Sequence, residues 1–140
     1  MSVGVGIIGT GIMGSEHARL LSRETSVAHL AGVFDADAAR AQAAAAGATV
    51  FPDPKSLIKS DRVGAVIIAS PDASHAELAL ACLEAGKPVL CEKPLASSAA
   101  EALRVVQTEV ALKRRLIQVG YMRRFDPGYQ EMKRDRKSVV

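Results

Sequence analysis

The sequence of 140 residues has no tryptophan, two cysteines and few aromatic residues of any kind (4%). Cys82 and Cys91 lack the spacing of a metal site and are too few for a disulfide framework, so we expect reduced thiols, a cytoplasmic protein and no metal. No apolar run approaches the roughly 18 residues of a membrane span, so we expect no membrane partner. The short run after Met1 is interrupted by glycine, and we interpret it as a first strand rather than a signal peptide.

The sequence is rich in apolar and basic residues. The hydrophobic fraction of 49% is enough for one domain with its own core. The net charge of +3 is uneven, because residues 113–140 hold nine Lys or Arg against three acids. A basic end is typical of nucleic-acid-binding proteins, but few aromatics and no recognition motif accompany it here. We therefore interpret it as a solvated helix face or an inter-domain surface and expect no nucleic-acid partner.

Short apolar runs of strand length alternate along the chain with segments of helical spacing. Several of the runs are rich in Val and Ile; they cover residues 3–8, 29–34, 65–69, 88–91 and 116–119. Continuous apolar strands that alternate with helices are typical of a parallel sheet covered on both faces. The sequence therefore predicts an α/β fold with a doubly wound parallel sheet of the Rossmann type.

The intervening segments carry helical faces and helix ends. One face is shared by Leu78, Ala79, Cys82 and Leu83, and a second by Leu103, Val106 and Val110. The alanine-rich residues 38–46 are interpreted as a closely packed helix. Two capping boxes are predicted, at Ser74 with Glu77 and at Ser98 with Glu101. Gly86 is predicted to end a helix in the left-handed conformation, and Asp126 before Pro127 to begin the last one.

The segment that follows the first apolar run carries glycines in the spacing G-x-G-x-x-G. The pattern follows a predicted strand and opens a predicted helix, which is the context that a phosphate-binding loop requires. Gly9 would permit the tight turn, Gly11 the approach of the backbone to a pyrophosphate, and Gly14 the packing of helix against strand. The positive helix end also favours a diphosphate. We predict a dinucleotide-binding loop made of Gly9, Thr10, Gly11, Ile12, Met13 and Gly14.

Asp35 ends the second apolar run, 21 residues beyond Gly14. A carboxylate at this position accepts hydrogen bonds from an adenosine ribose and repels a 2′-phosphate. No positively charged residue directly follows Asp35. Arg40 lies one helical turn further on, and its positive charge could partly accommodate the 2′-phosphate of NADP. We therefore expect NAD as the cofactor in preference to NADP. A helix cap is the alternative role of Asp35, and Asp37 is as well placed for it.

The carboxyl ends of the later predicted strands fall on the same edge of the sheet as the glycine loop. Ligands of such sheets bind in the crevice outside this edge. Glu92, Lys93 and Arg123 follow two of these strands, and we expect them to point toward the reactive end of a bound cofactor. Surface charges in ordinary turns are the alternative interpretation of all three.

Three segments together resemble the glucose–fructose oxidoreductase/inositol dehydrogenase (Gfo/Idh/MocA) family: GIIGTGIMGSEHA, ASPDASHAELALACLEAGKPVLCEKPLA and QVGYMRRFDPGY. The resemblance covers residues 3–133 and is strongest to the N-terminal half of inositol 2-dehydrogenases. Members of this family oxidise a secondary alcohol of a polyol or sugar to a ketone by hydride transfer to NAD(P). Nucleotide-binding methyltransferases use a similar glycine loop, but that interpretation does not explain the segment CEKPLA.

The resemblance also implies roles for single residues. It places Ser70, Pro71 and His75 along the middle of the dinucleotide and Glu92 near the nicotinamide ribose, and it makes Met122 and Arg123 part of a polyol pocket. Lys93 matches the active-site lysine, whose ammonium group can stabilise a developing alkoxide and relay its proton. In many members the peptide bond before the following proline, here Pro94, is cis. His75 contacts either cofactor or backbone in this interpretation.

Two other residues are given structural roles at this stage. We interpret His17 as a histidine packed on a helix and Tyr121 as a packing residue.

The family has a second α+β domain, which supplies an Asp and a His that serves as general base, and these 140 residues match neither. We expect residues 1–125 to form an NAD(P)-binding Rossmann domain and residues 126–140 to form the start of a linking helix with a truncated or divergent tail, KRDRKSVV. The sequence is then an isolated domain, a truncated gene product or a frame lost near residue 134. We expect it to be inactive alone and to self-associate through the surface left bare. The alternative is a non-catalytic dinucleotide-binding or interaction module.

Overall fold

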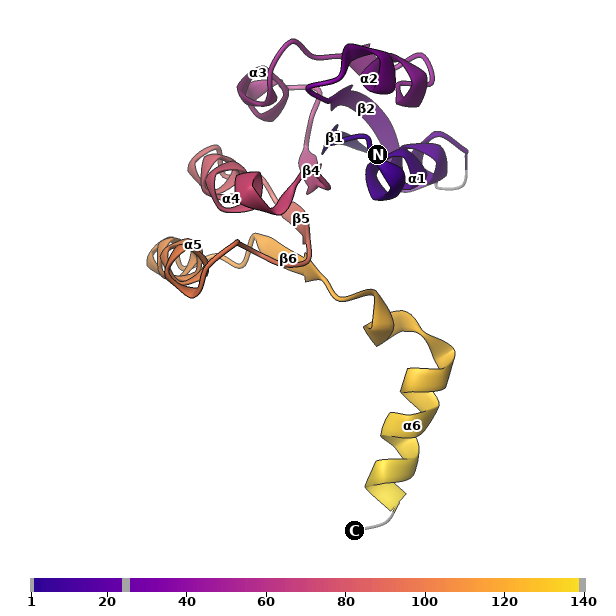
Figure 1. Ribbon diagram of the computed structural model, residues 1–140, viewed down its shortest axis with the longest axis vertical. Helices are drawn as coiled ribbons and strands as arrows, with labels where there is room; N and C mark the ends of the chain where they lie inside the picture. The colour runs from indigo at the N-terminus through magenta and orange to yellow at the C-terminus, as the bar shows by residue number, and fades with distance from the viewer. Residues whose placement is uncertain (1, 24–25, 139–140) are drawn as a thin grey trace.

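The computed structural model describes residues 2–23 and 26–138, which form one six-stranded sheet with helices on both faces (Figure 1). The strands are β1 (Val3–Ile8), β2 (Ala28–Phe34), β3 (Thr49–Val50), β4 (Ala65–Ile68), β5 (Val89–Glu92) and β6 (Ile117–Gly120). All neighbouring strands are parallel, in the order β3-β2-β1-β4-β5-β6. The order reverses at β1, and a crevice for ligands forms at such a switch point. The predicted doubly wound Rossmann-type fold is confirmed.

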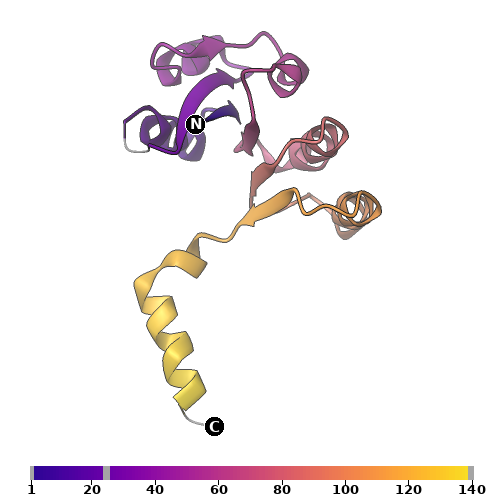
Figure 2. The ribbon, with the colours of Figure 1, turned by 180° about the vertical axis from the view of Figure 1, so that it is seen from behind.

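The helices divide between the two faces of the sheet. Helices α1 (Ile12–Arg23) and α2 (Ala38–Ala44) cover one face, and α3 (Pro54–Lys59), α4 (His75–Glu84) and α5 (Ala99–Ala111) cover the other (Figures 1 and 2). Two 3-10 turns, η1 (Asp72–Ser74) and η2 (Met122–Phe125), follow β4 and β6. Helix α6 (Pro127–Ser138) extends away from the sheet beyond η2 (Figure 2). No helix among the described residues has the length and hydropathy needed to cross a membrane.

The sheet separates two apolar clusters of different character. On the α3–α5 side the helices bury large side chains, among them Leu57, Ile58 and Leu83. On the other side the fully buried helix residues are Gly and Ala, for example Ala18 and Ala41. Small residues let α1 and α2 lie close to the strands. The start of α1 lies near the carboxyl edge of the sheet because the helix begins only four residues after the end of β1.

The five strands predicted from the sequence are all present, each within one residue of its predicted ends. Strand β3 was not predicted, because it consists of only two residues between an alanine-rich helix and a proline. It pairs with β2, where Thr49 lies opposite Gly32. Gly32 is needed there, since a Cβ at this position would lie 2.4 Å from the ring of Phe51.

Most of the predicted helix ends are confirmed. The hydroxyl of Ser98 accepts a hydrogen bond from the backbone N–H of Glu101 at 3.2 Å. The carboxylate of Asp126 accepts one from the N–H of Gly128 at 2.9 Å, at the start of α6. Gly86 follows α4 with φ = 67°, a left-handed conformation that favours glycine.

The capping box predicted at Ser74 is wrong. Ser74 belongs to the 3-10 turn η1 and makes no side-chain cap for α4. Its hydroxyl instead donates to the carbonyl oxygen of Pro71 at 2.7 Å and lies 2.6 Å from the hydroxyl of Ser70. The turn after β4 is therefore closed by these hydroxyls, and α4 begins only at His75.

Apolar residues at the C-terminal side of the fold are more exposed than their type suggests. The shared face of Leu103, Val106 and Val110 exists, but it faces solvent, and Val105 is the α5 residue that is buried in the core. The prediction of Tyr121 as a packing residue is wrong, because 59% of its surface is exposed. It lies where the chain leaves β6 and the sheet ends.

Candidate functional site

A cavity of about 490 Å³ lies at the carboxyl ends of β1, β2 and β4. It brings together residues that are far apart in the sequence: Ile8, Gly9, Gly11, Phe34, Asp35, Ala36, Arg40, Pro54, Ala69, Ser70, Pro71, Ser74 and Leu78. Several of the predicted cofactor residues, from the glycine loop, the end of β2 and the turn after β4, thus line one cavity at the switch point of the sheet.

The three glycines of the loop are required for different reasons. Gly9 has φ = 89°, and a Cβ there would lie 2.5 Å from the backbone nitrogen of Ser70. A Cβ on Gly14 would overlap the carbonyl oxygen of Gly9. Gly11 differs, since nothing of the protein lies within 4 Å of where its Cβ would be. The fold therefore explains Gly9 and Gly14, whereas the open space beside Gly11 fits a ligand that approaches the backbone closely, as a pyrophosphate does.

Asp35 is almost fully buried, with 6% of its side chain exposed, and it accepts four hydrogen bonds. One carboxylate oxygen receives the backbone N–H (2.7 Å) and hydroxyl (3.0 Å) of Thr10. The other receives the N–H of Asp37 (2.8 Å) and the guanidinium of Arg40 (2.9 Å). Burial raises the pKa of Asp35, but the hydrogen bonds from Arg40, Asp37 and Thr10 outweigh it and lower the pKa to about 2.

These four bonds fill the lone-pair sites of the carboxylate, which number about four. A ribose hydroxyl can therefore hydrogen-bond to Asp35 only if one of these four donors moves away from the carboxylate. Arg40 is the donor with the most freedom, since 57% of its side chain is exposed. Helix α2 has its own cap in Asp37, whose carboxylate accepts from Ala39 and Arg40. Asp35 is accordingly not the cap of this helix.

His75 is buried and bridges two backbone segments of the site. Its Nδ1 lies 2.6 Å from the carbonyl oxygen of Pro94, and its Nε2 lies 2.8 Å from that of Ser70. Of the two partners considered for His75, cofactor and backbone, the structure shows backbone. The side chain holds the turn after β4 against the segment after β5, where the Lys93–Pro94 peptide bond is cis.

Glu92 and Lys93 do not pair with each other. The carboxylate of Glu92 lies 2.8 Å from Nε2 of His17 on α1, and 13% of the Glu92 side chain is exposed. Lys93 is exposed, and its ammonium group has no hydrogen-bond or ion-pair partner among residues 2–23 and 26–135. His17 is partly buried on α1, in keeping with its interpretation as a packed helix residue, and it also contacts a charged group at the edge of the sheet. No local sequence signal joins two residues 75 positions apart.

Comparisons with known proteins identify the family of this chain. The profile of a family described as "Oxidoreductase family, NAD-binding Rossmann fold" (GFO_IDH_MocA) matches residues 3–121. The chain belongs to the Gfo/Idh/MocA family. It contains the NAD-binding Rossmann domain of that family, which confirms the resemblance seen in the three sequence segments.

Relatives and solved structures point to one branch of the family. The Gfo/Idh/MocA chain is 56% identical to inositol 2-dehydrogenase 1 of Saccharopolyspora erythraea over 96% of this chain and 41% of the relative. It is 53% identical to the inositol 2-dehydrogenase of Rubrobacter xylanophilus over 94% and 38%. The structure of myo-inositol dehydrogenase from Lactobacillus casei with NAD(H) and myo-inositol superimposes with a TM-score of 0.94, at 35% identity, covering all of this chain and 42% of that one. The chain thus spans about two fifths of the length of these relatives.

Met122 and Arg123 of the Gfo/Idh/MocA domain lie in η2, beyond the end of β6, and neither lines the cavity at the glycine loop. Both are exposed. The guanidinium of Arg123 lies 3.4 Å from the carboxylate of Asp126 and stacks 5.3 Å from the ring centre of Tyr129. Their placement is set by the turn into α6.

The two cysteines of the domain are free and buried. Burial raises the pKa of each thiol to about 12. Among the described residues, no group of three or more His, Cys, Asp or Glu side chains is arranged to hold a metal ion. Cys82 and Cys91 are therefore core residues of the Gfo/Idh/MocA fold.

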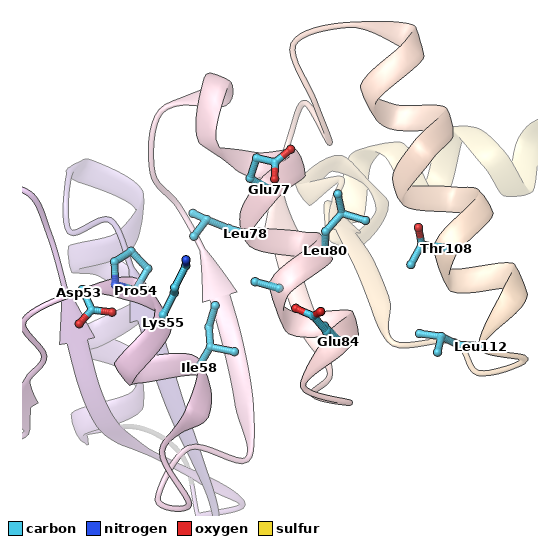
Figure 3. A pocket seen from close by; sticks show the side chains of 11 residues that line it. Asp53, Pro54, Lys55, Ile58, Glu77, Leu78, Leu80, Glu84, Thr108 and Leu112 are labelled. Atoms are coloured by element: carbon cyan, nitrogen blue, oxygen red, sulfur yellow. The ribbon is translucent and has the colours of Figure 1, made fainter.

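A second cavity of about 840 Å³ lies between α3, α4 and α5 (Figure 3). Its wall is mostly apolar and includes Ile58, Leu80 and Leu112, with Glu77 and Glu84 also on it. It is larger than the cavity at the glycine loop, but no residue of that loop lines it. The glycine loop, Asp35 and the turn after β4 meet at the smaller cavity.

Proposed function

We propose that this chain is the cofactor-binding part of an NAD-dependent dehydrogenase that oxidises a secondary alcohol of an inositol-like polyol or sugar to a ketone. The observation that carries the proposal is Lys93, an exposed ammonium group at the carboxyl end of β5, on the same edge of the sheet as the glycine loop. Similarity to inositol dehydrogenases supports the polyol as substrate class. Bound NAD would accept the hydride, and residues of the protein would bind the cofactor and act on the reacting alcohol.

The cofactor tasks are divided among the strand ends. The loop of residues 9–14 would hold the diphosphate with its backbone N–H groups, and Asp35 would hold the adenosine ribose after Arg40 gives way. Ser70 and Pro71, which line the cavity, would lie along the middle of the dinucleotide. Glu92 would accept hydrogen bonds from the nicotinamide ribose.

Lys93 would act on the reacting alcohol. Its ammonium group would donate a hydrogen bond that stabilises the negative charge developing on the substrate oxygen, while the hydroxyl proton would pass to a separate base. Met122 and Arg123 would line the polyol pocket from η2. These roles leave Lys93 as the one catalytic residue that we assign to this chain.

The same proposal extends to the organisation of the protein. Residues 1–125 form the NAD(P)-binding domain, and residues 126–140 begin a linking helix; the extension of α6 away from the sheet supports this boundary (Figure 2). We propose a cytoplasmic location, in keeping with free cysteines. Self-association is also proposed, since apolar side chains on α5 and α6 such as Val110 and Met132 are exposed.

Calorimetric titration of the chain with NAD and, separately, with NADP tests the cofactor assignment. The absence of tryptophan makes intrinsic fluorescence a poor substitute. We expect NAD to bind more tightly than NADP, because the Asp35 carboxylate opposes a 2′-phosphate. Titration of myo-inositol onto the NAD-loaded chain then tests the substrate class, with Lys93→Met as the matched variant that should bind NAD but lose the heat from inositol. Binding of neither nucleotide, or equal binding of both, would refute the cofactor assignment.

A further inference from the structure

His17 and Glu92 form a side-chain bridge across the carboxyl edge of the sheet. His17 lies on α1, the helix that begins directly after the glycine loop, and Glu92 is the last residue of β5. In the sheet, β4 separates β5 from β1, the strand that leads into the glycine loop. The 2.8 Å contact between His17 Nε2 and a Glu92 carboxylate oxygen therefore links the phosphate-binding end of the site to the strand that presents Lys93. A carboxylate oxygen accepts, so Nε2 is the donor.

The other oxygen of the same carboxylate lies against β6. Gly120 is the register partner of Glu92, and a Cβ at Gly120 would come within 2.8 Å of that oxygen. The backbone at Gly120 has no positive φ, so a methyl group added there would act by displacing the Glu92 carboxylate. His17 on α1 donates a hydrogen bond to one oxygen of the carboxylate, and the missing side chain of Gly120 on β6 leaves room for the other oxygen. The side chains of His17 and Glu92 are only 23% and 13% exposed, so solvent screens this contact less than a surface ion pair.

We propose that His17 is a positioning residue for the nicotinamide end of the cofactor site. By donating to one oxygen of Glu92, it directs the second oxygen over Gly120 and holds the end of β5, and with it Lys93, at a set place relative to the glycine loop. This inference rests on the proposed function. It adds a residue of α1 that acts through Glu92 and not by contact with the adenosine half of NAD.

The test compares two nucleotides that share one half. NAD reaches both ends of the site, whereas ADP contains only the adenosine and diphosphate part. In His17→Leu, calorimetry should show about tenfold weaker NAD binding, the effect of losing one hydrogen bond to a charged group. ADP binding should stay within about twofold of wild type. His17→Gln, whose amide can still donate to Glu92, should recover most of the NAD affinity.

Gly120→Ala provides an independent variant, because the added methyl group displaces the carboxylate while His17 remains. It should also weaken NAD more than ADP. Equal loss of both nucleotides in His17→Leu would mean that His17 only supports the fold and would overturn the proposal, as would unchanged NAD binding in both variants. Wild-type protein that binds ADP but gains nothing from the nicotinamide half would also overturn it. Failure to bind either nucleotide would instead remove the proposed function on which it rests.

Discussion

Substitution of Gly11 by alanine separates the needs of the cofactor from those of the fold. Apart from residue 11 and its two chain neighbours, no protein atom lies within 4 Å of the new Cβ, and the backbone at this position does not require glycine. We therefore expect the free energy of unfolding to fall by no more than about 1 kcal/mol, the usual effect of alanine at a helix N-terminus. NAD affinity should fall far more, because the methyl group occupies the space through which the diphosphate approaches the backbone. Loss of one hydrogen bond to a charged group costs about 1.5–3 kcal/mol, or roughly 10- to 150-fold in Kd.

Gly14→Ala is the matched control on the same loop. Its Cβ would overlap the carbonyl oxygen of Gly9, so this variant should lose stability as well as binding. Thermal unfolding measures the first effect and calorimetric titration with NAD the second. A folded Gly11→Ala protein that binds NAD like the wild type would show that the cofactor does not approach the loop at Gly11, and the argument from the glycines would fail.

Three further results are expected. Asp35→Asn should raise the affinity for NADP relative to NAD by about tenfold in paired titrations, because it removes a negative charge and releases Arg40 to meet a 2′-phosphate; an unchanged ratio would contradict this. Wild-type stability should fall as the pH drops from about 4 to about 2, since the pKa of Asp35 is lowered from 3.8 to about 2 on folding, and denaturant titrations should show a flatter fall in Asp35→Asn. Cys82 and Cys91 should resist iodoacetamide in the folded protein and react after unfolding, as mass spectrometry can show, because burial raises both pKa values to about 12.

The sequence was most informative where one residue type satisfies a local rule. Apolar runs predicted five strands, and Ser98, Asp126 and Gly86 identified helix ends that the structure confirms. These features depend on neighbours within a few positions. The two-residue β3 carries too few residues for such a pattern, and it forms because β2 offers it a partner.

For the candidate site, the sequence predicted single residues but not their contacts, because the contacting partners come from distant elements. The glycine loop and Asp35 were predicted as site residues from their spacing, whereas the four donors around Asp35 were not predicted. The contact of His17 with Glu92 was not predicted, because the helical face of His17 looks apolar in the sequence and Glu92 lies at the end of a distant strand. His75 had two interpretations that the sequence alone left open, contact with cofactor and contact with backbone, and its two backbone contacts appear only in the structure.

The two faces of the sheet should respond to mutation in opposite ways. Between α1, α2 and the sheet, the fully buried helix residues are already as small as glycine and alanine, so truncation has almost nothing to remove and enlargement of Ala18 or Ala41 forces the helices off the strands. On the other face, truncation of Leu57 or Leu83 leaves a cavity. Space is therefore the limiting factor on the side of the sheet that carries α1 and α2, whereas loss of side-chain volume is the main risk on the side of α3, α4 and α5.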